Sequence, residues 1–281
     1  MNQHLKPNNT CHCSDNAPKF LQIKMNNRCN GNCWFCIDKN NLAPQKMNVD
    51  KMISATLSEE EYQVVSITGG EPFLDFDVLL TLLKGIRPYK KEIIVNTNGS
   101  IISKDKVEKL NSLVDELRIA LHHYDEEINS SIIGTPVRFS KIQKSLLGKN
   151  FKVTFNMTIT SAMENNTNGF VDELTQLCHM LNVDGVKISE LKYTGNSDFY
   201  PKYANGHIEA YHFFKHLNVI EYKDSKDLIT KGCVDIFIYK GIEFLLKRLC
   251  GYKIVPQLQT FKVVYSNGEK ADDWIYNFSN L

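Results

Sequence analysis

The chain has 281 residues, of which 42% are hydrophobic and 23% charged, as is typical of a globular protein with one large α/β domain or two ordinary ones. Its formal net charge of +1 gives no attraction to nucleic acid or to a membrane surface, so we expect neither as a partner. Residues 1–14 are polar and no stretch is long and apolar enough to span a bilayer, which predicts a cytoplasmic protein whose eight cysteines are reduced.

Short β-branched runs alternate with helical patterns between residues 20 and 195. This alternation favours parallel strands joined by crossover helices. The predicted strands are 20–25, 64–68, 93–96, 117–121, 152–160 and 186–190, with amphipathic helices over 75–84 and 169–181. Six βα units are two short of a closed (β/α)8 barrel, so we predict an α/β fold with a partial (β/α)6 TIM-type barrel over residues 20–195.

A cysteine-rich loop follows the first predicted strand directly. Cys29, Cys33 and Cys36 have a C-x3-C-x2-C spacing with no fourth cysteine close behind. A closed zinc or iron–sulfur site normally takes four protein ligands, so three thiolates would hold a cubane cluster by three irons and leave the fourth iron open. An open metal position is what a reactive site needs. The alternative is a structural zinc site with a fourth ligand from residues 11–13.

Polar motifs also end the next three predicted strands. Residues 68–72 (TGGEP) end the second strand, residues 96–100 (NTNGS) the third, and residues 122–123 (HH) the fourth. The carboxyl ends of parallel strands meet at one edge of a sheet or barrel, where ligands bind. We therefore predict one functional site that joins these motifs to the cysteine loop.

The pattern changes after about residue 195. A helix is predicted over 207–217 and strands over 234–239, 242–249, 261–265 and 274–278, with a hairpin signal at the Asn-Gly of 267–268. We expect residues 1–19 to form an N-terminal extension. Residues 196–281 are predicted to be a C-terminal α+β extension that caps the open side of the barrel and contributes to substrate binding.

In these motifs the chain resembles the radical S-adenosylmethionine (SAM) enzymes, over residues 20–191. The cysteine loop matches the family's C-x3-C-x-aromatic-C signature with Phe35 in the aromatic position. Residues 69–72 match the family's glycine-rich glutamate motif at the second strand.

Two branches of that family are the most similar. Residues 96–99, Asn156 and residues 187–191 have counterparts in the GTP cyclases of the molybdopterin pathway. Residues 124–134 are similar to the corresponding segment of viperin-like nucleotide dehydratases.

The resemblance implies two cofactors. A 4Fe-4S cluster would be held by Cys29, Cys33 and Cys36, with the amine and carboxylate of SAM on its open iron. Reduction of the cluster, by an external electron donor such as flavodoxin or ferredoxin, would cleave the sulfonium and produce a 5′-deoxyadenosyl radical.

Contacts to SAM are implied as well. Glu71 would accept hydrogen bonds from the methionine ammonium, and Gly69 and Gly70 would let the backbone approach the ligand. The other implied contacts are the Phe35 backbone to adenine, Asn96 and Asn98 to the ribose or carboxylate, and Asn156 and Ser189 at strand ends. From the residues alone, Glu71 is also compatible with a solvated loop carboxylate, residues 96–99 with an ordinary turn, and Asn156 with a satisfied strand end.

The chain departs from the cyclase pattern at the fourth strand. Ala120 and His122 stand where the cyclases usually carry a serine and an acid, so the serine's contact to the cofactor carboxylate is lost. We predict His122, whose ordinary pKa is near 6.5, as a catalytic residue that donates a hydrogen bond to the substrate or transfers a proton. The alternative is a structural histidine, which is the interpretation for His123.

The cysteines outside the loop leave further alternatives. The cyclases' C-terminal cysteine triad is not visible, which argues against molybdopterin synthesis. Cys11, Cys13, Cys233 and Cys250 are enough for one auxiliary iron–sulfur cluster. Cys233 is otherwise predicted as a catalytic thiol that donates a hydrogen atom to a substrate radical. Cys178 lies in a helical pattern and is expected to be buried and inert.

The substrate class follows from the shape expected of the barrel. Six βα units leave a lateral opening suited to a small-molecule or nucleotide-like substrate, with Lys187, Ser189 and Glu190 as natural contacts. Radical modification of a ribosomal peptide, by epimerisation or cross-linking, is the alternative, with a separate protein supplying peptide recognition. A structural zinc or electron-transfer protein without cofactor cleavage is the remote alternative.

Overall fold

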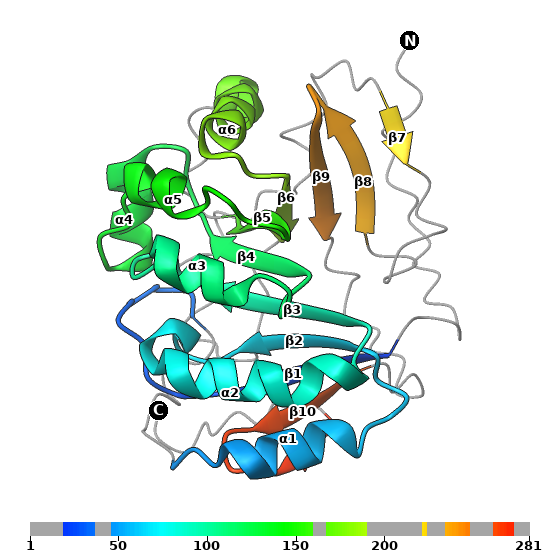
Figure 1. The fold of residues 1–281 in the computed structure, drawn as a ribbon. Helices are drawn as coiled ribbons and strands as arrows, with labels where there is room; N and C mark the ends of the chain where they lie inside the picture. Colours follow the sequence, from blue (N-terminus) through cyan, green and yellow to red (C-terminus); the bar gives the residue numbers. More distant parts are fainter. Residues whose placement is uncertain are drawn as a thin grey trace, which may run out of the picture.

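The structure, a computed structural model, is built on one large β-sheet. It describes residues 19–36, 46–159, 167–189, 221–223, 234–247 and 261–272. The strands are β1 Phe20–Lys24, β2 Val64–Thr68, β3 Glu92–Thr97, β4 Glu116–Ala120, β5 Lys152–Thr158, β6 Gly185–Ser189, β7 Glu221–Lys223, β8 Val234–Tyr239, β9 Ile242–Lys247, β10 Phe261–Tyr265 and β11 Lys270–Ala271. Their order in the sheet is β11-β10-β1-β2-β3-β4-β5-β6-β9-β8-β7 (Figure 1).

Helices join the parallel strands β1 to β6. They are α1 Val49–Leu57, η2 Pro72–Asp75, α2 Phe76–Ile86, η3 Arg87–Tyr89, α3 Lys104–Leu110, α4 Glu126–Ile133, α5 Phe139–Ser145 and α6 Thr167–Leu181. Side-chain caps begin four of them: Asn48 accepts from an amide of α1, Glu71 from one of η2, Ser103 from one of α3, and Asp125 from two of α4. None of the helices in the described residues has the length and apolarity needed to cross a membrane.

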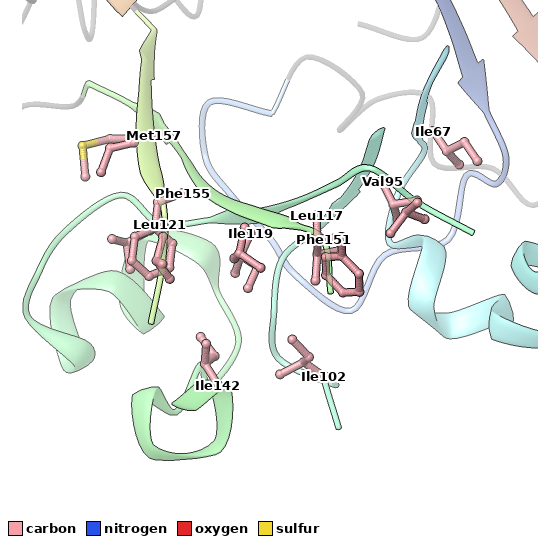
Figure 2. Packing of buried hydrophobic residues seen from close by; sticks show 14 of the residues in the cluster. Ile67, Val95, Ile102, Leu117, Ile119, Leu121, Ile142, Phe151, Phe155 and Met157 are labelled. Carbon is pink, nitrogen blue, oxygen red and sulfur yellow. The ribbon is translucent and has the colours of Figure 1, made fainter. Parts of the chain in front are cut away.

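The two faces of the sheet differ in chemistry, because side chains alternate along each strand. One face carries the hydrophobic core, which packs against helices α1 to α6 along one side of the sheet (Figure 1). Figure 2 shows part of this core, where residues of β2 to β5 meet Ile102 and Ile142. The opposite, inner face is polar from β1 to β6 and includes Gln22, Ser66, Asn96, Arg118, Thr154, Asn156, Lys187 and Ser189. A polar inner face is available to a ligand rather than to a second apolar layer.

The predicted partial barrel is confirmed, and its sheet is not closed. All six predicted barrel strands are present within two residues of their expected ends. The C-terminal extension contributes its strands to the same sheet at both edges: β9 pairs in parallel with β6, and β10 pairs in parallel with β1. The division into three domains stays a prediction.

The expected hairpin is present with a different second strand. β10 turns back through Asn267 and Gly268, and its antiparallel partner is β11 rather than the run over 274–278. Gly268 has a φ of 86°, the left-handed conformation that an Asn-Gly turn requires. The helix predicted over 207–217 and the strand over 274–278 lie outside the described residues.

Glu59 ties the tail strands to the barrel. Its side chain is 8% exposed and accepts hydrogen bonds from Lys262 Nζ at 2.9 Å and Lys270 Nζ at 2.7 Å. Burial raises the pKa of Glu59, but the hydrogen bonds from the two lysines outweigh it and hold the pKa below its usual range. Ionised Glu59 therefore stabilises the attachment of β10 and β11.

We expect Glu59→Gln to lower the free energy of unfolding at pH 7 by about 1 to 2 kcal/mol. The value is modest because solvent weakens the interaction of Glu59 with the half-exposed Lys270. This contribution is present above the carboxyl's unfolded pKa and is lost as the pH falls through its lower folded pKa. Urea denaturation measures it, with Glu60→Gln, at an exposed neighbouring position, as the control. Equal losses in the two variants would contradict a specific role for Glu59.

Candidate active site at the carboxyl ends of β1 to β4

The cysteine loop, residues 29–36, is anchored to the loop between β2 and η2. The amide of Gly70 donates to both the backbone oxygen and Oδ1 of Asn26 at 3.0 Å, and the amide of Glu71 donates to the backbone oxygen of Arg28 at 2.7 Å. Asn26 Nδ2 and the Arg28 guanidinium both reach the carboxylate of Asp75. These bonds hold the chain just before Cys29 in one position.

Gly69 and Gly70 are needed because two loops of the protein approach each other closely. Gly69 has a φ of 155°, and a Cβ on it would meet Asn26. A Cβ on Gly70 would overlap the backbone of Arg28 and come within 2.9 Å of Cys29 N. The close approach required here is therefore within the protein, and backbone contact to a ligand stays a prediction.

Glu71 is fully buried and links β2 to β3. Its Oε1 accepts hydrogen bonds from Phe73 N at 2.9 Å and Thr97 Oγ1 at 2.7 Å, and its Oε2 accepts from Asn98 N at 2.6 Å. Burial raises the pKa of the carboxyl, whereas these three donors and the nearby Lys106 favour its ionised form. The carboxylate holds the two strand ends that flank the cysteine loop, and its contact to a SAM ammonium stays a prediction.

The two asparagines of the NTNGS motif have different partners. Asn96, half-buried on the inner face, donates through Nδ2 to Ser66 Oγ and to the Ile67 backbone oxygen, both at 2.9 Å, which directs its Oδ1 away from them. Asn98 donates through Nδ2 to Asn30 Oδ1 at 2.9 Å, inside the cysteine loop. Asn96 therefore presents an acceptor at the inner face, whereas Asn98 belongs to the support of the loop.

The end of α4 supports the loop from a third direction. The amide of Asn32 donates to the Ile133 backbone oxygen at 2.7 Å, and Cys33 Sγ lies 3.6 Å from the same oxygen. Gly134 ends the helix with a φ of 73°, and a Cβ there would come within 2.9 Å of Asn32. Only glycine allows this helix end to lie directly against the loop.

The three cysteines provide a donor set that fits an iron–sulfur cluster. All three are half-buried thiols on one loop, and Cys29 Sγ accepts a hydrogen bond from Gly31 N at 3.3 Å. Burial raises the pKa of the Cys29 thiol, and the Gly31 amide opposes that rise. Within the described residues no three Cys, His, Asp or Glu side chains converge as ligands of a single ion do. Ligation of an iron–sulfur cluster does not require such convergence on one ion, because each thiolate binds a different iron.

His122 lies at the end of β4, against the cysteine loop. It is 4% exposed, and its ring meets that of Phe35 edge to face with centroids 4.8 Å apart. Its Nδ1 accepts a hydrogen bond from Thr158 N at 3.1 Å, which places the ring proton on Nε2. Burial lowers the pKa of His122 to about 4, so the imidazole is neutral at pH 7. In this neutral state His122 is better suited to donate a hydrogen bond than to transfer a proton. Its catalytic role stays a prediction.

The buried imidazole of His122 should make the protein lose stability in acid. Its folded pKa of about 4 lies below the ordinary value near 6.5, so the unfolded chain binds a proton that the folded protein excludes. Protonation of this group should lower the free energy of unfolding by about 3 kcal/mol as the pH falls from about 6.5 to about 4. Urea unfolding of wild type and His122→Asn across this range tests it, since asparagine can accept the Thr158 hydrogen bond without titrating. Parallel stability curves for the two proteins would contradict this effect.

The structure places the remaining predicted residues on the inner face or outside the described chain. Ala120, Asn156 and Lys187 lie side by side across β4, β5 and β6, and half-buried Ser189 ends β6. Cys178 is fully buried in α6, and burial raises its pKa to about 12, as expected of an inert thiol. The residues outside the described chain are His12, Cys11, Cys13, Glu190, Cys233 and Cys250.

Several residues that build the site carry no strong sequence signal. Asn26 and Asn30 precede and follow Cys29, and an asparagine near a loop is an ordinary occurrence. Asp75 and Thr158 act through partners distant in sequence. Ser100, whose hydroxyl accepts from Asn30 and donates to Asn98, is the exception, because it belongs to the NTNGS motif.

Comparison with known proteins agrees with this geometry. Residues 23–162 match the model of the radical SAM superfamily. A putative peptide biosynthesis protein, YydG of Bacillus subtilis, is 26% identical over 178 residues, which cover 61% of this chain and 54% of the relative. A probable GTP 3′,8-cyclase of Thermococcus kodakarensis is 29% identical over 121 residues, covering 41% of this chain and 38% of the relative. The chain thus spans about half or less of these relatives.

The fold is also shared with a solved structure. The crystal structure of Streptococcus suis SuiB superimposes with a TM-score of 0.60 at 18% identity, covering 91% of this chain and 60% of that one. At this identity the likeness concerns the fold alone. It extends over the barrel and the strands that follow it.

Proposed function

Because the chain belongs to the radical SAM superfamily, we propose that it holds a 4Fe-4S cluster on Cys29, Cys33 and Cys36, cleaves SAM reductively and abstracts a hydrogen atom from its substrate. The observation that carries this proposal is the position of the cysteine loop. It lies at the carboxyl ends of β1 to β4, anchored by hydrogen bonds to the β2–η2 loop, the β3–α3 loop and the end of α4. Ligand sites of α/β barrels lie at this edge.

The cofactors would supply one-electron cleavage of the sulfonium, giving methionine and a 5′-deoxyadenosyl radical, with the electron from an external donor such as flavodoxin or ferredoxin. The residues of this chain would hold and orient them. Asn96 Oδ1 is oriented to accept from a ribose or an ammonium, and Phe35, between Trp34 and His122, lies where the loop would meet adenine. Neutral His122 would donate through Nε2.

For the substrate, we propose a small-molecule or nucleotide-like compound bound on the polar inner face. Asn156, Lys187 and Ser189 are half-buried there, beside the carboxyl ends of the strands. The cyclase relatives, named for their action on GTP, support a nucleotide. The small side chain of Ala120, next to Asn156, would leave room beside the cofactor.

A peptide substrate is the second candidate. It is supported by the match to YydG, which is named for peptide biosynthesis and matches over 178 residues. A thiol such as Cys233 would then be a hydrogen-atom donor to a peptide radical.

Anaerobic reconstitution tests the proposed function. We expect about four irons and four sulfides per chain, and 5′-deoxyadenosine when dithionite and SAM are added. Cys33→Ala should lose iron and product, whereas Cys178→Ala, which removes a buried thiol outside the loop, should retain both. Zinc in the purified protein, with no product after reconstitution, would contradict the proposal. Deuterium transfer into 5′-deoxyadenosine from labelled nucleotides or labelled peptides separates the two substrate classes.

A further inference from the structure

Three side chains form a closed hydrogen-bond circuit between the cysteine loop and the β3–α3 loop. Asn30 Nδ2 donates to Ser100 Oγ at 2.8 Å, Ser100 Oγ donates to Asn98 Oδ1 at 2.6 Å, and Asn98 Nδ2 donates to Asn30 Oδ1 at 2.9 Å. Each of the three side chains donates a hydrogen bond to the next one and accepts a hydrogen bond from the previous one. The circuit joins residues 68 to 70 positions apart in the sequence.

The circuit determines which end of the Asn98 amide faces the cysteines. The backbone amide of Ser100 also donates to Asn98 Oδ1, at 2.9 Å, and a backbone N–H can only donate. The atom that it contacts must therefore be the oxygen. Asn98 Nδ2, with two hydrogens, then faces Asn30 and the adjacent Cys29.

Cys29 has one amide donor and a second amide beside it. Gly31 N donates to its Sγ at 3.3 Å, and the Asn98 side chain, which is bound to the adjacent Asn30, favours the thiolate form of Cys29. The backbone amide of Asn98 is engaged separately, with Glu71 Oε2 at 2.6 Å. A substitution of the Asn98 side chain thus removes the amide beside Cys29 and leaves the backbone link to Glu71 in place.

We propose that Asn98 is a positioning residue for the cluster, which donates a hydrogen bond to the Cys29 sulfur and thereby makes the cluster easier to reduce. The proposal rests on the function proposed above. Hydrogen bonds to the ligating sulfurs are among the features that set the reduction potential of an iron–sulfur cluster. A donor stabilises the reduced state more, because that state carries more negative charge. Asn98 then acts on the electron transfer that precedes SAM cleavage, through Cys29 rather than through a contact to SAM.

The test is the midpoint potential of the reconstituted cluster, followed by electron paramagnetic resonance during a redox titration. Asn98→Ala should make one-electron reduction about tenfold less favourable, a shift of about −59 mV. Asn98→Asp, which places a negative charge where the donor stood, should shift the potential further in the same direction. The matched control is Asn111→Asp, since Asn111 bridges Gly148 and Asn150 in another loop and should leave the potential unchanged.

The outcomes separate this proposal from the proposed function. A wild-type protein that assembles no cluster contradicts the proposed function. Clusters with equal potentials in wild type, Asn98→Ala and Asn98→Asp overturn the role of Asn98 alone. If neither variant retains iron, Asn98→Ser, whose hydroxyl can donate, takes their place. Loss of iron from Asn98→Ser as well would mark a purely structural residue and overturn the proposal.

Discussion

Replacing Gly70 with alanine should displace the cysteine loop and lower the free energy of unfolding by more than about 3 kcal/mol. The added Cβ would overlap the Arg28 backbone and come within 2.9 Å of Cys29 N. Both neighbours are main chain, so no side-chain rotation can relieve the overlap. The displacement would also weaken the hydrogen bonds from Gly70 N to Asn26 and from Glu71 N to Arg28.

Urea denaturation and iron content after reconstitution measure this effect together. We expect Gly70→Ala to lose both stability and iron. Gly148→Ala is the matched control: its φ of 81° also favours glycine, but no atom lies within 4 Å of the added Cβ. The Gly148→Ala control should lower the free energy of unfolding by about 1 kcal/mol and retain full iron content. Full iron content in Gly70→Ala would show that the close approach does not position the cysteines.

Glu71→Gln should cost about 3 kcal/mol of stability and most of the iron content. The two oxygens of Glu71 accept three hydrogen bonds, from Phe73 N, Thr97 Oγ1 and Asn98 N. A glutamine amide would direct an N–H toward at least one of these donors inside a fully buried site. The loops after β2 and β3 would then separate, and both of them contact the cysteine loop.

Glu116→Gln is the control for Glu71, because Glu116 is also a buried carboxylate. It pairs with Arg118 at the opposite, amino end of the strands. It should lose stability without losing iron. Isothermal titration with SAM separates the two roles of Glu71: a Glu71→Gln variant with wild-type iron and stability but weakened SAM binding would support the ammonium contact and contradict the structural role.

The barrel was predictable because its signals are local. Buried parallel strands consist of β-branched runs such as 64–68, and the predicted bounds of β2 equal the observed ones. The motifs at the strand ends were brought together as expected, since parallel strands place their carboxyl ends on one edge. The placement of the tail strands was less predictable. Whether β9 and β10 cover the barrel or extend its sheet depends on pairing between segments far apart in the chain.

The roles of individual site residues were less accessible from the sequence. Motif recognition identifies Gly70, Glu71 and Asn98 but does not distinguish contact with a ligand from support of the cysteine loop. That distinction depends on distances between loops, such as Asn98 Nδ2 to Asn30 Oδ1 and Ile133 O to Asn32 N. His122 is a further case, because its neutral state results from burial, against Phe35 among others, and its tautomer is fixed by the hydrogen bond from the Thr158 amide.

The central claim is that the cysteine loop holds a cluster with one iron open to SAM. The most direct measurement is the electron paramagnetic resonance spectrum of the reduced, reconstituted protein with and without SAM. We predict that SAM changes the spectrum, because it binds the iron that has no cysteine ligand. A spectrum that is the same at saturating SAM as in its absence, from a protein with about four irons per chain, would contradict the account.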